Sequence, residues 1–242
     1  MRAVVFAGGL GTRLRPYTTV LPKPLVPVGG RPILEHILGQ LAGYGVTQVD
    51  LCVAHLGELI RAYFTEAHAA PQDLELRWHW EDEPLGTAGA LRVVPDLEGT
   101  FLAMNGDVLT NLNYRALFDY HRDRDALLTI AMHRKHVHID LGVIENSDGF
   151  VSAYREKPVL NYEVSMGVYI YDARALEYLP EGQCQFPDRV QRLLAADQVV
   201  AAFPAYDAEW FDIGTFGELE RATARLEERP DLFRAPDVHA GT

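Results

Sequence analysis

Short apolar runs recur along the chain and predict buried β-strands. They fall at residues 3–6, 48–53, 74–80, 101–105, 127–132, 164–171 and 199–203. Between the early runs, apolar residues repeat at steps of three and four, which predicts amphipathic helices. These helices are expected at residues 33–44, 57–67 and 113–122. Strands that alternate with helices predict an α/β fold, with a mostly parallel central sheet and helices on both faces.

The second half of the chain is less regular. Residues 142–145 and 151–154 flank a turn at 146–149, which predicts an antiparallel hairpin. We expect this region to elaborate the same domain and to supply the pocket of a second substrate. A polar helix is predicted to close a single domain at residue 228, and residues 229–242 are predicted to form a loose C-terminal tail.

Composition narrows the class of protein. Hydrophobic residues make up 48% of the 242 residues, enough for a sizeable core, which argues against disorder. The formal net charge of -12 argues against a general nucleic-acid binder, which would present a basic face. An anionic small-molecule substrate stays compatible with this charge, because a pocket can be locally basic on an acidic protein.

No apolar segment approaches the length that spans a bilayer, and the run at residues 3–7 is too short for a signal peptide. The two cysteines, Cys52 and Cys184, show no CxxC spacing. We therefore expect a cytoplasmic, reduced protein without a membrane partner and without structural zinc.

A glycine-rich turn follows the first predicted strand, where a parallel sheet presents its ligands. Three glycines lie within four positions and precede Thr12; they are Gly8, Gly9 and Gly11. Glycines at this density let the backbone approach a phosphate and point its N–H groups at it. Arg13 and Arg15 add charge that can bind a pyrophosphate bidentately. The turn is therefore predicted to bind phosphates, although glycines also form plain tight turns.

Two better-known phosphate loops do not match this turn. The dinucleotide fingerprint requires glycine where Leu14 stands, and the Walker A pattern requires Gly-Lys where Arg13 and Leu14 stand. A second basic segment follows at residues 22–24, where two prolines flank Lys23 and keep it out of a helix interior. Held in this way, Lys23 can serve as a fixed charge beside a phosphate, but an exposed loop lysine would look the same.

Together these segments resemble the sugar-nucleotide pyrophosphorylase family (sugar-1-phosphate nucleotidyltransferases), whose members include mannose-1-phosphate guanylyltransferase and glucose-1-phosphate thymidylyltransferase. The family pattern G-G-x-G-T-R-L-x-P-x-T and P-K-P corresponds to residues 8–18 and 22–24. Four more landmarks follow in order: LGTAG at 85–89, NGD at 105–107, EKP at 156–158 and WFDIG at 210–214. The resemblance implies a Rossmann-like fold of the nucleotide-diphospho-sugar transferase type. It further implies a nucleotide half of about residues 1–110 and a sugar-phosphate half of about 111–228.

The resemblance also implies roles for individual residues. The nucleoside triphosphate would be held by Ala7, Gly8, Gly9, Gly11, Thr12, Glu81, Gly86 and Thr87. The catalytic residues would be Arg13, Lys23, Asp107, Lys157 and Asp212. The cofactor would be Mg²⁺, held by Asp107 and Asp212, because this hard cation prefers carboxylate oxygens. The sugar 1-phosphate would be held by Gly142, Glu156, Lys157, Ser165 and Gly167.

The activity that the resemblance implies is the transfer of a nucleoside monophosphate to a sugar 1-phosphate, with release of pyrophosphate. A phosphate oxygen is already a competent nucleophile, so neither a general base nor a covalent intermediate is expected. The LGTAG segment favours a GDP-sugar such as GDP-mannose; thymidylyl or uridylyl transfer to glucose 1-phosphate or an amino sugar 1-phosphate is the alternative. Met166 departs from the small residue of many relatives and is expected to reshape the sugar pocket. Relatives often assemble as homo-oligomers.

Structural alternatives exist for several of these residues. Asp107 could form a turn, Asp212 could cap the following helix, and Glu156 with Lys157 could be a solvated pair. The histidines at 133, 136 and 138 lack zinc-ligand spacing and are interpreted as part of a basic surface loop near the sugar pocket.

Two other classes of function fit the sequence less well. A non-catalytic sugar-nucleotide sensor is disfavoured because the charged residues of the resemblance are all present. A nicotinamide-dependent oxidoreductase is disfavoured because the third glycine and the ribose-binding carboxylate are missing.

Overall fold

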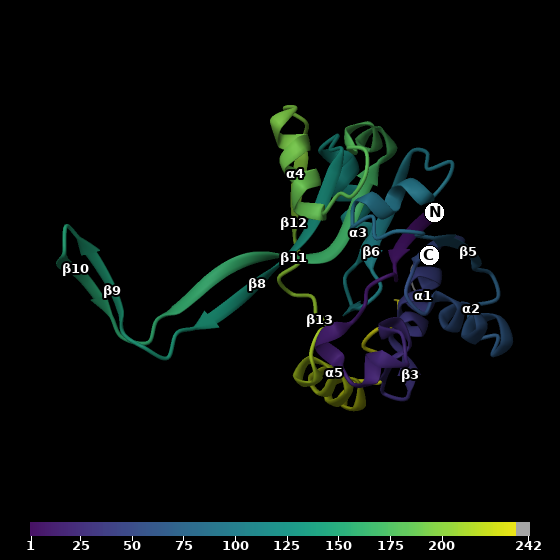
Figure 1. Ribbon diagram of the computed structural model, residues 1–242, viewed down its shortest axis with the longest axis horizontal. Helices are drawn as coiled ribbons and strands as arrows, with labels where there is room; N and C mark the ends of the chain where they lie inside the picture. The colour runs from purple at the N-terminus through teal and green to yellow at the C-terminus, as the bar shows by residue number, and fades with distance from the viewer. Residues whose placement is uncertain (236–242) are drawn as a thin grey trace, which may run out of the picture.

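The computed structural model describes residues 1–235 and is built around a mixed seven-stranded sheet (Figure 1). From edge to edge its strands are β12 (Val200–Pro204), β8 (Leu128–His138), β11 (Val159–Asp172), β6 (Thr100–Asn105), β1 (Arg2–Phe6), β4 (Gln48–Val53) and β5 (Glu75–Trp80). Four of the six pairings are parallel; only β11 runs antiparallel to both neighbours, β6 and β8. The predicted α/β fold is confirmed, and all seven predicted strands are present.

Helices cover both faces of this sheet because successive strand residues point to opposite sides. Val5 of β1 packs in one core layer and Val4 in the other. The first layer is covered by α1 (Ile33–Gly43), α2 (Gly57–Glu66), α3 (Tyr114–Asp123) and α5 (Phe216–Glu228). The second is covered by the 3-10 helices η4 (Gly89–Val93) and η5 (Ala173–Tyr178) and by α4 (Phe186–Ala195). Within residues 1–235, no helix is both long and apolar enough to cross a membrane.

The sheet topology determines where a ligand can bind. From β1 the chain crosses to β4 on one side, and β6 later joins β1 on the other side. The carboxyl ends of these three parallel strands therefore diverge at a topological switch point, the usual binding crevice of an open α/β sheet. The glycine-rich turn and Asp107 follow β1 and β6 at this edge.

Short elements complete this edge. They are η1 (Thr12–Leu14), η2 (Tyr17–Thr19), η3 (Lys23–Leu25), β2 (Pro27–Val28), β3 (Arg31–Pro32), β7 (Val108–Thr110) and β13 (Trp210–Asp212). The strands β7 and β13 pair antiparallel, with Asp212 opposite Val108. This small sheet brings the WFDIG segment from late in the chain to the NGD segment after β6.

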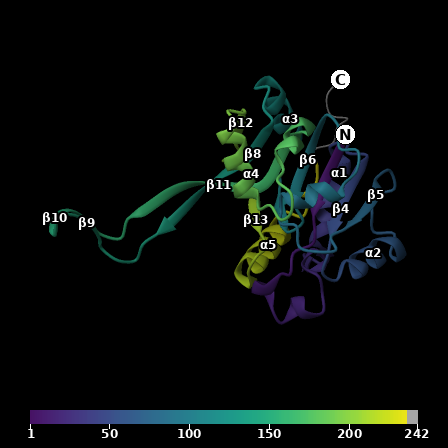
Figure 2. The ribbon, with the colours of Figure 1, turned by 45° about the horizontal axis from the view of Figure 1, so that its top comes forward.

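A long arm projects from the sheet. β8 and β11 continue as a two-stranded ribbon beyond their neighbours, and β9 (Val143–Ser147) pairs with β10 (Phe150–Arg155) at the outer end (Figures 1 and 2). The predicted hairpin is present, but it lies at the end of this arm. We call residues 132–165 the arm; none of its side chains is buried.

The C-terminal segment differs from the expected loose tail as far as residue 235. Leu232 and Phe233 are both buried in the first core layer. The Phe233 ring packs edge-on against His36 and Phe211. The prediction was wrong for this part because two apolar side chains in a short polar segment are enough to attach it to the core. Residues 236–242 of the predicted tail lie outside the described residues.

Candidate active site

The glycine-rich turn folds tightly against the residues that follow it. Gly11 has a φ of +59°, in the left-handed region that favours glycine. A Cβ atom there would lie 2.9 Å from the Thr18 side chain, whose hydroxyl donates to the Gly11 carbonyl at 2.7 Å. The turn then enters η1, where the Leu14 N–H donates to the Gly11 carbonyl at 2.9 Å. Glycine is therefore required at position 11 for both space and conformation.

Lys23 is a buried residue of η3, only 7% exposed. Its ammonium donates to the carboxylate of Asp107, which follows β6. The pair joins the second basic segment to the NGD segment. Burial distinguishes Lys23 from an exposed loop lysine. The contact with Asp107 accounts for this burial, since burying an unpaired ammonium is costly.

Asp107 directly precedes β7, and Asp212 is the last residue of β13, the strand that pairs with β7. The Ile213 N–H donates to the Asp107 backbone carbonyl at 3.0 Å. Burial, together with the negative charge of Asp107, raises the pKa of Asp212 above its usual range, against the opposing charges of Lys23 and Arg13. Thr215, rather than Asp212, caps α5, because its hydroxyl accepts from the Glu218 N–H at 3.3 Å. Asp212 is thus free of the capping role considered for it.

Arg13 lies against the end of the WFDIG segment. A Cβ atom on Gly214 would lie 2.9 Å from Nη2 of the Arg13 guanidinium and 3.0 Å from its Cζ and Nη1 atoms. The guanidinium therefore rests directly over the glycine backbone, close to Asp212. Position 214 leaves room for Arg13 only because it has no side chain.

A cavity of about 530 Å³ opens at the carboxyl ends of β1 and β6. Six of the predicted site residues line it: Gly8, Gly9, Glu81, Gly86, Thr87 and Asp107. His55, Gln183 and Gln185 also line it, and sequence reasoning missed all three because they belong to no recognisable motif. The two glutamines come from the second half of the chain, so both halves contribute to this cavity.

Glu81 lies at the end of β5, inside the cavity. A Cβ atom on Gly8 would lie 3.1 Å from the Glu81 carboxylate, so glycine lets the turn approach this acid. Burial raises the pKa of the Glu81 carboxyl, and the Leu85 N–H, which donates to it at 3.1 Å, acts in the opposite direction. The carboxylate keeps acceptor capacity that can face a ligand.

The LGTAG segment is held by the segment before α4. The N–H groups of Ala88 and Gly89 donate to the Cys184 carbonyl at 3.1 and 3.0 Å. The Thr87 hydroxyl accepts from the Phe186 N–H at 3.1 Å. Gly86 has a φ of +79°, and a Cβ atom there would lie 2.6 Å from the same Cys184 carbonyl. Glycine at this position allows two segments of backbone to form one wall of the cavity.

Ser165 and Gly167 lie where β11 re-enters the body of the protein. Gly167 has a φ of +75°, and its Cβ atom would meet the Asn105 amide at 2.6 Å, beside Asp107. The Ser165 hydroxyl donates to the Tyr169 hydroxyl at 3.3 Å, and burial raises the pKa of Tyr169 to about 12. Met166, expected to reshape the sugar pocket, is instead fully buried in the core and does not line the cavity.

Gly142, Glu156 and Lys157 are not brought to this cavity. All three belong to the arm, where Glu156 and Lys157 are exposed. The Tyr154 hydroxyl donates to the Glu156 carboxylate at 2.9 Å and fills the space that a Cβ atom on Gly142 would need. The structure therefore groups Gly142 with Glu156, but away from Asp107. Their predicted role in holding a sugar phosphate stays a prediction.

Comparison with known proteins identifies the family. A family model described as nucleotidyl transferase matches residues 2–229. The chain belongs to the nucleotidyl transferase family. It is 30% identical to the UTP–glucose-1-phosphate uridylyltransferase of Synechocystis sp., covering all of this chain and 69% of that protein. It is 32% identical to the mannose-1-phosphate guanylyltransferase of Mycobacterium tuberculosis, covering 93% of this chain and 64% of that protein.

The solved structure of HddC from Yersinia pseudotuberculosis has the same fold. It superposes with a TM-score of 0.74 at 26% identity, covering 93% of this chain and 99% of that one. The same protein has also been solved in complex with GMP-PN, at 25% identity and a TM-score of 0.70. Against the two curated relatives the chain spans only about two thirds of their length. The family is thereby established, while the relatives named differ in the base they transfer.

The histidine segment of this nucleotidyl transferase is a strand, not the predicted surface loop. His133, His136 and His138 all lie on β8, in the first part of the arm. His133 donates from Nε2 to the Ala208 carbonyl at 3.0 Å and packs against Trp210.

In the described part of the chain, no cluster of three or more histidine, cysteine or acidic side chains is arranged to hold a metal. Asp107 and Asp212 remain the pair of acids predicted to hold a cation.

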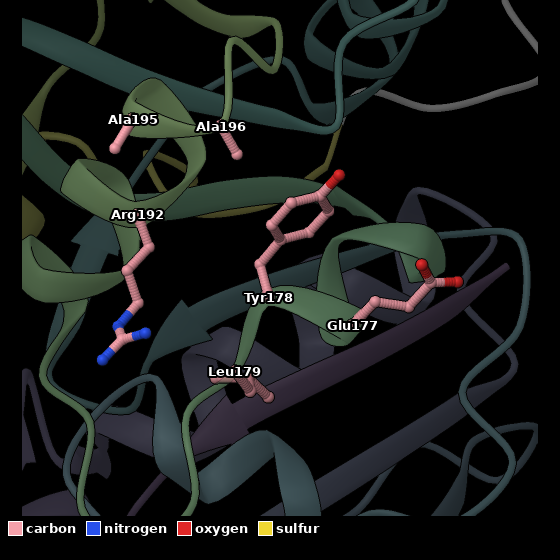
Figure 3. A pocket seen from close by; sticks show the side chains of 6 residues that line it. All are labelled: Glu177, Tyr178, Leu179, Arg192, Ala195 and Ala196. Carbon is pink, nitrogen blue, oxygen red and sulfur yellow. The ribbon is translucent and has the colours of Figure 1, made fainter.

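A second hollow lies between η5 and α4, with a volume of about 430 Å³ (Figure 3). Figure 3 shows Arg192 from α4 and Tyr178 with Glu177 from η5 around it. None of the predicted site residues lines this hollow. The cavity at the carboxyl ends of the parallel strands is therefore the candidate active site of this family member.

Proposed function

We propose that the protein transfers a nucleoside monophosphate from a nucleoside triphosphate to a sugar 1-phosphate, giving an NDP-sugar and pyrophosphate. The observation that carries this proposal is the convergence of Lys23, Asp107, Asp212 and Arg13 beside the glycine-lined cavity. Two cations and two carboxylates at the switch point of a parallel sheet suit a reaction between two phosphate anions.

The glycine-rich turn supports binding of the triphosphate. Gly8, Gly9 and Gly11 leave the backbone N–H groups accessible to phosphate oxygens, as in other anion-binding turns. We assign Ala7 and Thr12 to the same turn. Arg13 would hold the β- and γ-phosphates bidentately, and Lys23 would act as a fixed charge beside the α-phosphate.

Mg²⁺ is the cofactor that fits the acidic pair. Asp212 pairs with Val108, the residue after Asp107, and the Ile213 N–H donates to the Asp107 carbonyl at 3.0 Å, which supports a cation shared between the two acids. Magnesium is typically bound by one or two carboxylates together with substrate phosphates. Asp107 and Asp212 would hold it, and it would supply charge neutralisation at the phosphates.

The residues of the chain contribute to the reaction by positioning the two substrates and neutralising charge. An oxygen of the sugar phosphate attacks the α-phosphorus in line, the new P–O bond forms, and the bond to pyrophosphate breaks on the opposite side. Arg13 and Lys23 neutralise the charge that develops on the departing pyrophosphate. The nucleophile is already an anion, so no proton is transferred and no enzyme-bound covalent intermediate forms.

The nucleobase would lie in the cavity between Gly86, Thr87 and Glu81. A carboxylate there is complementary to guanine, whose pairing edge offers two adjacent N–H donors. Uracil and thymine present one N–H donor between two carbonyl acceptors, and a carboxylate repels those acceptors. This supports GTP as the substrate and a GDP-sugar such as GDP-mannose as the product. The guanylyltransferase of M. tuberculosis and the complex of HddC with GMP-PN agree with this preference.

Uridylyl or thymidylyl transfer to glucose 1-phosphate or an amino sugar 1-phosphate is the alternative, supported by the uridylyltransferase of Synechocystis. On the second-substrate side we propose a sugar-phosphate half of about residues 111–228 facing a nucleotide half of about residues 1–110. In it, Ser165 and Gly167 would contact the sugar, while Glu156 and Lys157 would bind a hydroxyl and the phosphate.

The test is pyrophosphate release with Mg²⁺ over a matrix of five nucleoside triphosphates and common hexose 1-phosphates. We expect release that requires both substrates and is greatest with GTP. Tight nucleotide binding without release for any pair would contradict transfer and would favour the non-catalytic sensor. Greatest release with UTP or dTTP would keep transfer and overturn the choice of guanine.

A further inference from the structure

We propose that the arm delivers Glu156 and Lys157 into the active site of a second copy of the chain, so that each site is shared between two subunits. This inference rests on the proposed function and adds to it which molecule supplies the sugar-phosphate half. Lys23, Asp107 and Asp212 lie together in the body of the protein, whereas Lys157 lies on the arm.

The arm of the same subunit holds Lys157 too far from its own cavity. The β8–β11 pairing is continuous from Ser165, opposite Met132, to Val159, opposite His138. Six residues of extended strand at ~3.3 Å each cover roughly 20 Å, and Lys157 lies two residues further out. Figures 1 and 2 show the arm leading away from the sheet in both views. A lysine side chain spans only a small part of that distance.

The arm also lacks a hydrophobic core of its own. From residue 132 to residue 165 no side chain is buried. An isolated two-stranded ribbon is only marginally stable in water, because it needs a third strand or a packed face. A ribbon of this length is therefore expected to have its apolar side chains covered in the working protein.

The apolar side chains of the arm are numerous and exposed. Eight large ones belong to it: Val137, Leu141, Ile144, Phe150, Val151, Tyr154, Val159 and Tyr162. At the outer end the register places Ile144 opposite Tyr154 and Val151 opposite Asn146, so three apolar side chains share one face of the hairpin. Contiguous exposed apolar surface of this kind marks an interaction site.

A receiving surface lies on the body, next to the active site. Tyr17 and Val20 are 63% and 74% exposed, and Phe216 is 38% exposed. The Tyr17 and Phe216 rings pack edge to face with centroids 5.5 Å apart. Phe216 follows Gly214 by two residues, and Gly214 contacts Arg13. An arm that covers this surface would bring its own charged residues beside Arg13.

A second copy is the partner that these observations favour. The arm carries Glu156 and Lys157, which are predicted to complete the site and are absent from the body. The body of every copy of the chain lacks them in the same way. Two copies related by a twofold axis would exchange arms reciprocally and complete both sites at once. An unrelated partner would cover the apolar face but would leave Lys157 without a phosphate to bind.

The test is complementation between two inactive variants. Asp107→Asn inactivates the body of one subunit, and Lys157→Ala inactivates the arm of the other. We would co-express them with different affinity tags and purify the mixed assembly in two steps. If arms act in the partner, one of the two sites in each mixed dimer pairs an intact Asp107 with an intact Lys157. The mixed dimer is then expected to show about half the wild-type activity, with each variant alone inactive.

A mixed dimer without activity, when the wild-type protein is active, would overturn the shared site and would indicate that each arm folds back onto its own body. An inactive wild-type protein would instead count against the proposed transfer. Arg13→Ala replaces Asp107→Asn as the body variant if the latter does not fold.

A second readout does not depend on activity. The mass in solution is expected to be twice the 27.1 kDa of one chain. Ile144→Glu on the hairpin should convert the dimer to a monomer, while Leu194→Glu on α4, at a side chain of similar exposure (54% against 49%), should leave the dimer intact. A wild-type protein that is monomeric at assay concentration, or a dimer that Ile144→Glu leaves intact, would overturn the proposal.

Discussion

The ammonium of Lys23 donates a hydrogen bond to the carboxylate of Asp107, although 84 positions separate the two residues in the sequence. The pair lies where the glycine turn after β1 meets the end of β6. Each residue compensates the charge of the other in the absence of substrate, which allows a buried lysine beside a phosphate site. Bound phosphates and Mg²⁺ would replace these mutual contacts with contacts to the reacting groups.

Replacement of Asp107 tests this centre. Asp107→Asn removes the negative charge but keeps the shape, and we expect kcat to fall by about 10²–10³-fold, as for other losses of a charge-stabilising group. The measurement is steady-state pyrophosphate release, with circular dichroism to confirm folding. Asp119→Asn, at an exposed carboxylate on α3, is the control and should leave kcat unchanged. A kcat for Asp107→Asn within threefold of wild type would remove this residue from the catalytic centre.

The contact between Arg13 and Gly214 gives a second prediction. Gly214→Ala places a methyl group about where the Arg13 guanidinium lies, so the guanidinium must move. We expect kcat to fall at least tenfold, roughly the loss of one charge-assisted hydrogen bond. Gly217→Ala is a matched control, because a Cβ atom there meets no atom within 4 Å. Equal kcat values for the two variants would show that the position of Arg13 is unimportant.

Gly86 gives a third prediction, on nucleotide binding. Gly86→Ala adds a Cβ atom 2.6 Å from the Cys184 carbonyl at a φ of +79°, so the cavity wall must shift. Gly45 has a φ of +81° with no atom near its Cβ position, so Gly45→Ala incurs only the backbone strain of about 1–2 kcal/mol. We expect a raised KM for the nucleoside triphosphate in Gly86→Ala alone, measured at saturating sugar phosphate. An unchanged KM would place the base elsewhere.

The choice of base gives a fourth prediction. Glu81→Gln replaces an acceptor-only carboxylate with an amide that also donates, which weakens pairing with guanine N–H groups. We expect kcat/KM for GTP to fall about 10–100-fold, the range for loss of a hydrogen bond to a charged group, with a smaller loss for UTP. The ratio of the two values is the informative measurement. A ratio that does not change would mean that Glu81 does not read the base.

Stability should depend on pH through two buried histidines. Burial lowers the pKa values of His36 and His121 below 6.5. Between 6.5 and those lowered values the unfolded chain binds more protons than the folded protein, so the free energy of unfolding falls as pH falls. Each histidine contributes a slope of at most ~1.4 kcal/mol per pH unit.

The measurement is the urea midpoint between pH 7.5 and 5.5. His121→Gln should flatten the pH dependence, and His138→Gln, at an exposed position on the arm, should not. A steeper or unchanged slope in His121→Gln would contradict the assignment to burial of a neutral imidazole.

Regular elements with a clear pattern of buried residues were predictable from the sequence. The strand over residues 48–53 agrees residue for residue, since Val49–Val53 are buried without interruption. The helix α4 was not predicted because Arg189, a charged residue, occupies a buried position on it and breaks the apolar pattern. The outer parts of β8 and β11 were missed for a different reason. Both faces of the arm are exposed, so no alternation of polar and apolar residues marks them.

The site residues were also only partly predictable from the sequence. The phosphate turn and Asp107 follow β1 and β6, so the topology of a parallel sheet brings them together. Asp212 joins them through the antiparallel pairing of β13 with β7. Glu156 and Lys157 follow a hairpin that no parallel-sheet rule places, and their distance from Asp107 could not be foreseen. The contribution of Gln183 and Gln185 to the cavity depends on the return of the chain before α4, which leaves no local pattern.

Transfer itself is tested most directly by following the oxygen atoms. With a sugar 1-phosphate carrying ¹⁸O on its non-bridging oxygens, in-line attack on the α-phosphorus places one labelled oxygen in the P–O–P bridge. Mass spectrometry is then expected to find an NDP-sugar that retains all of the label and a pyrophosphate that carries none. A nucleoside monophosphate as the product, or label in the pyrophosphate, would contradict attack by the sugar phosphate.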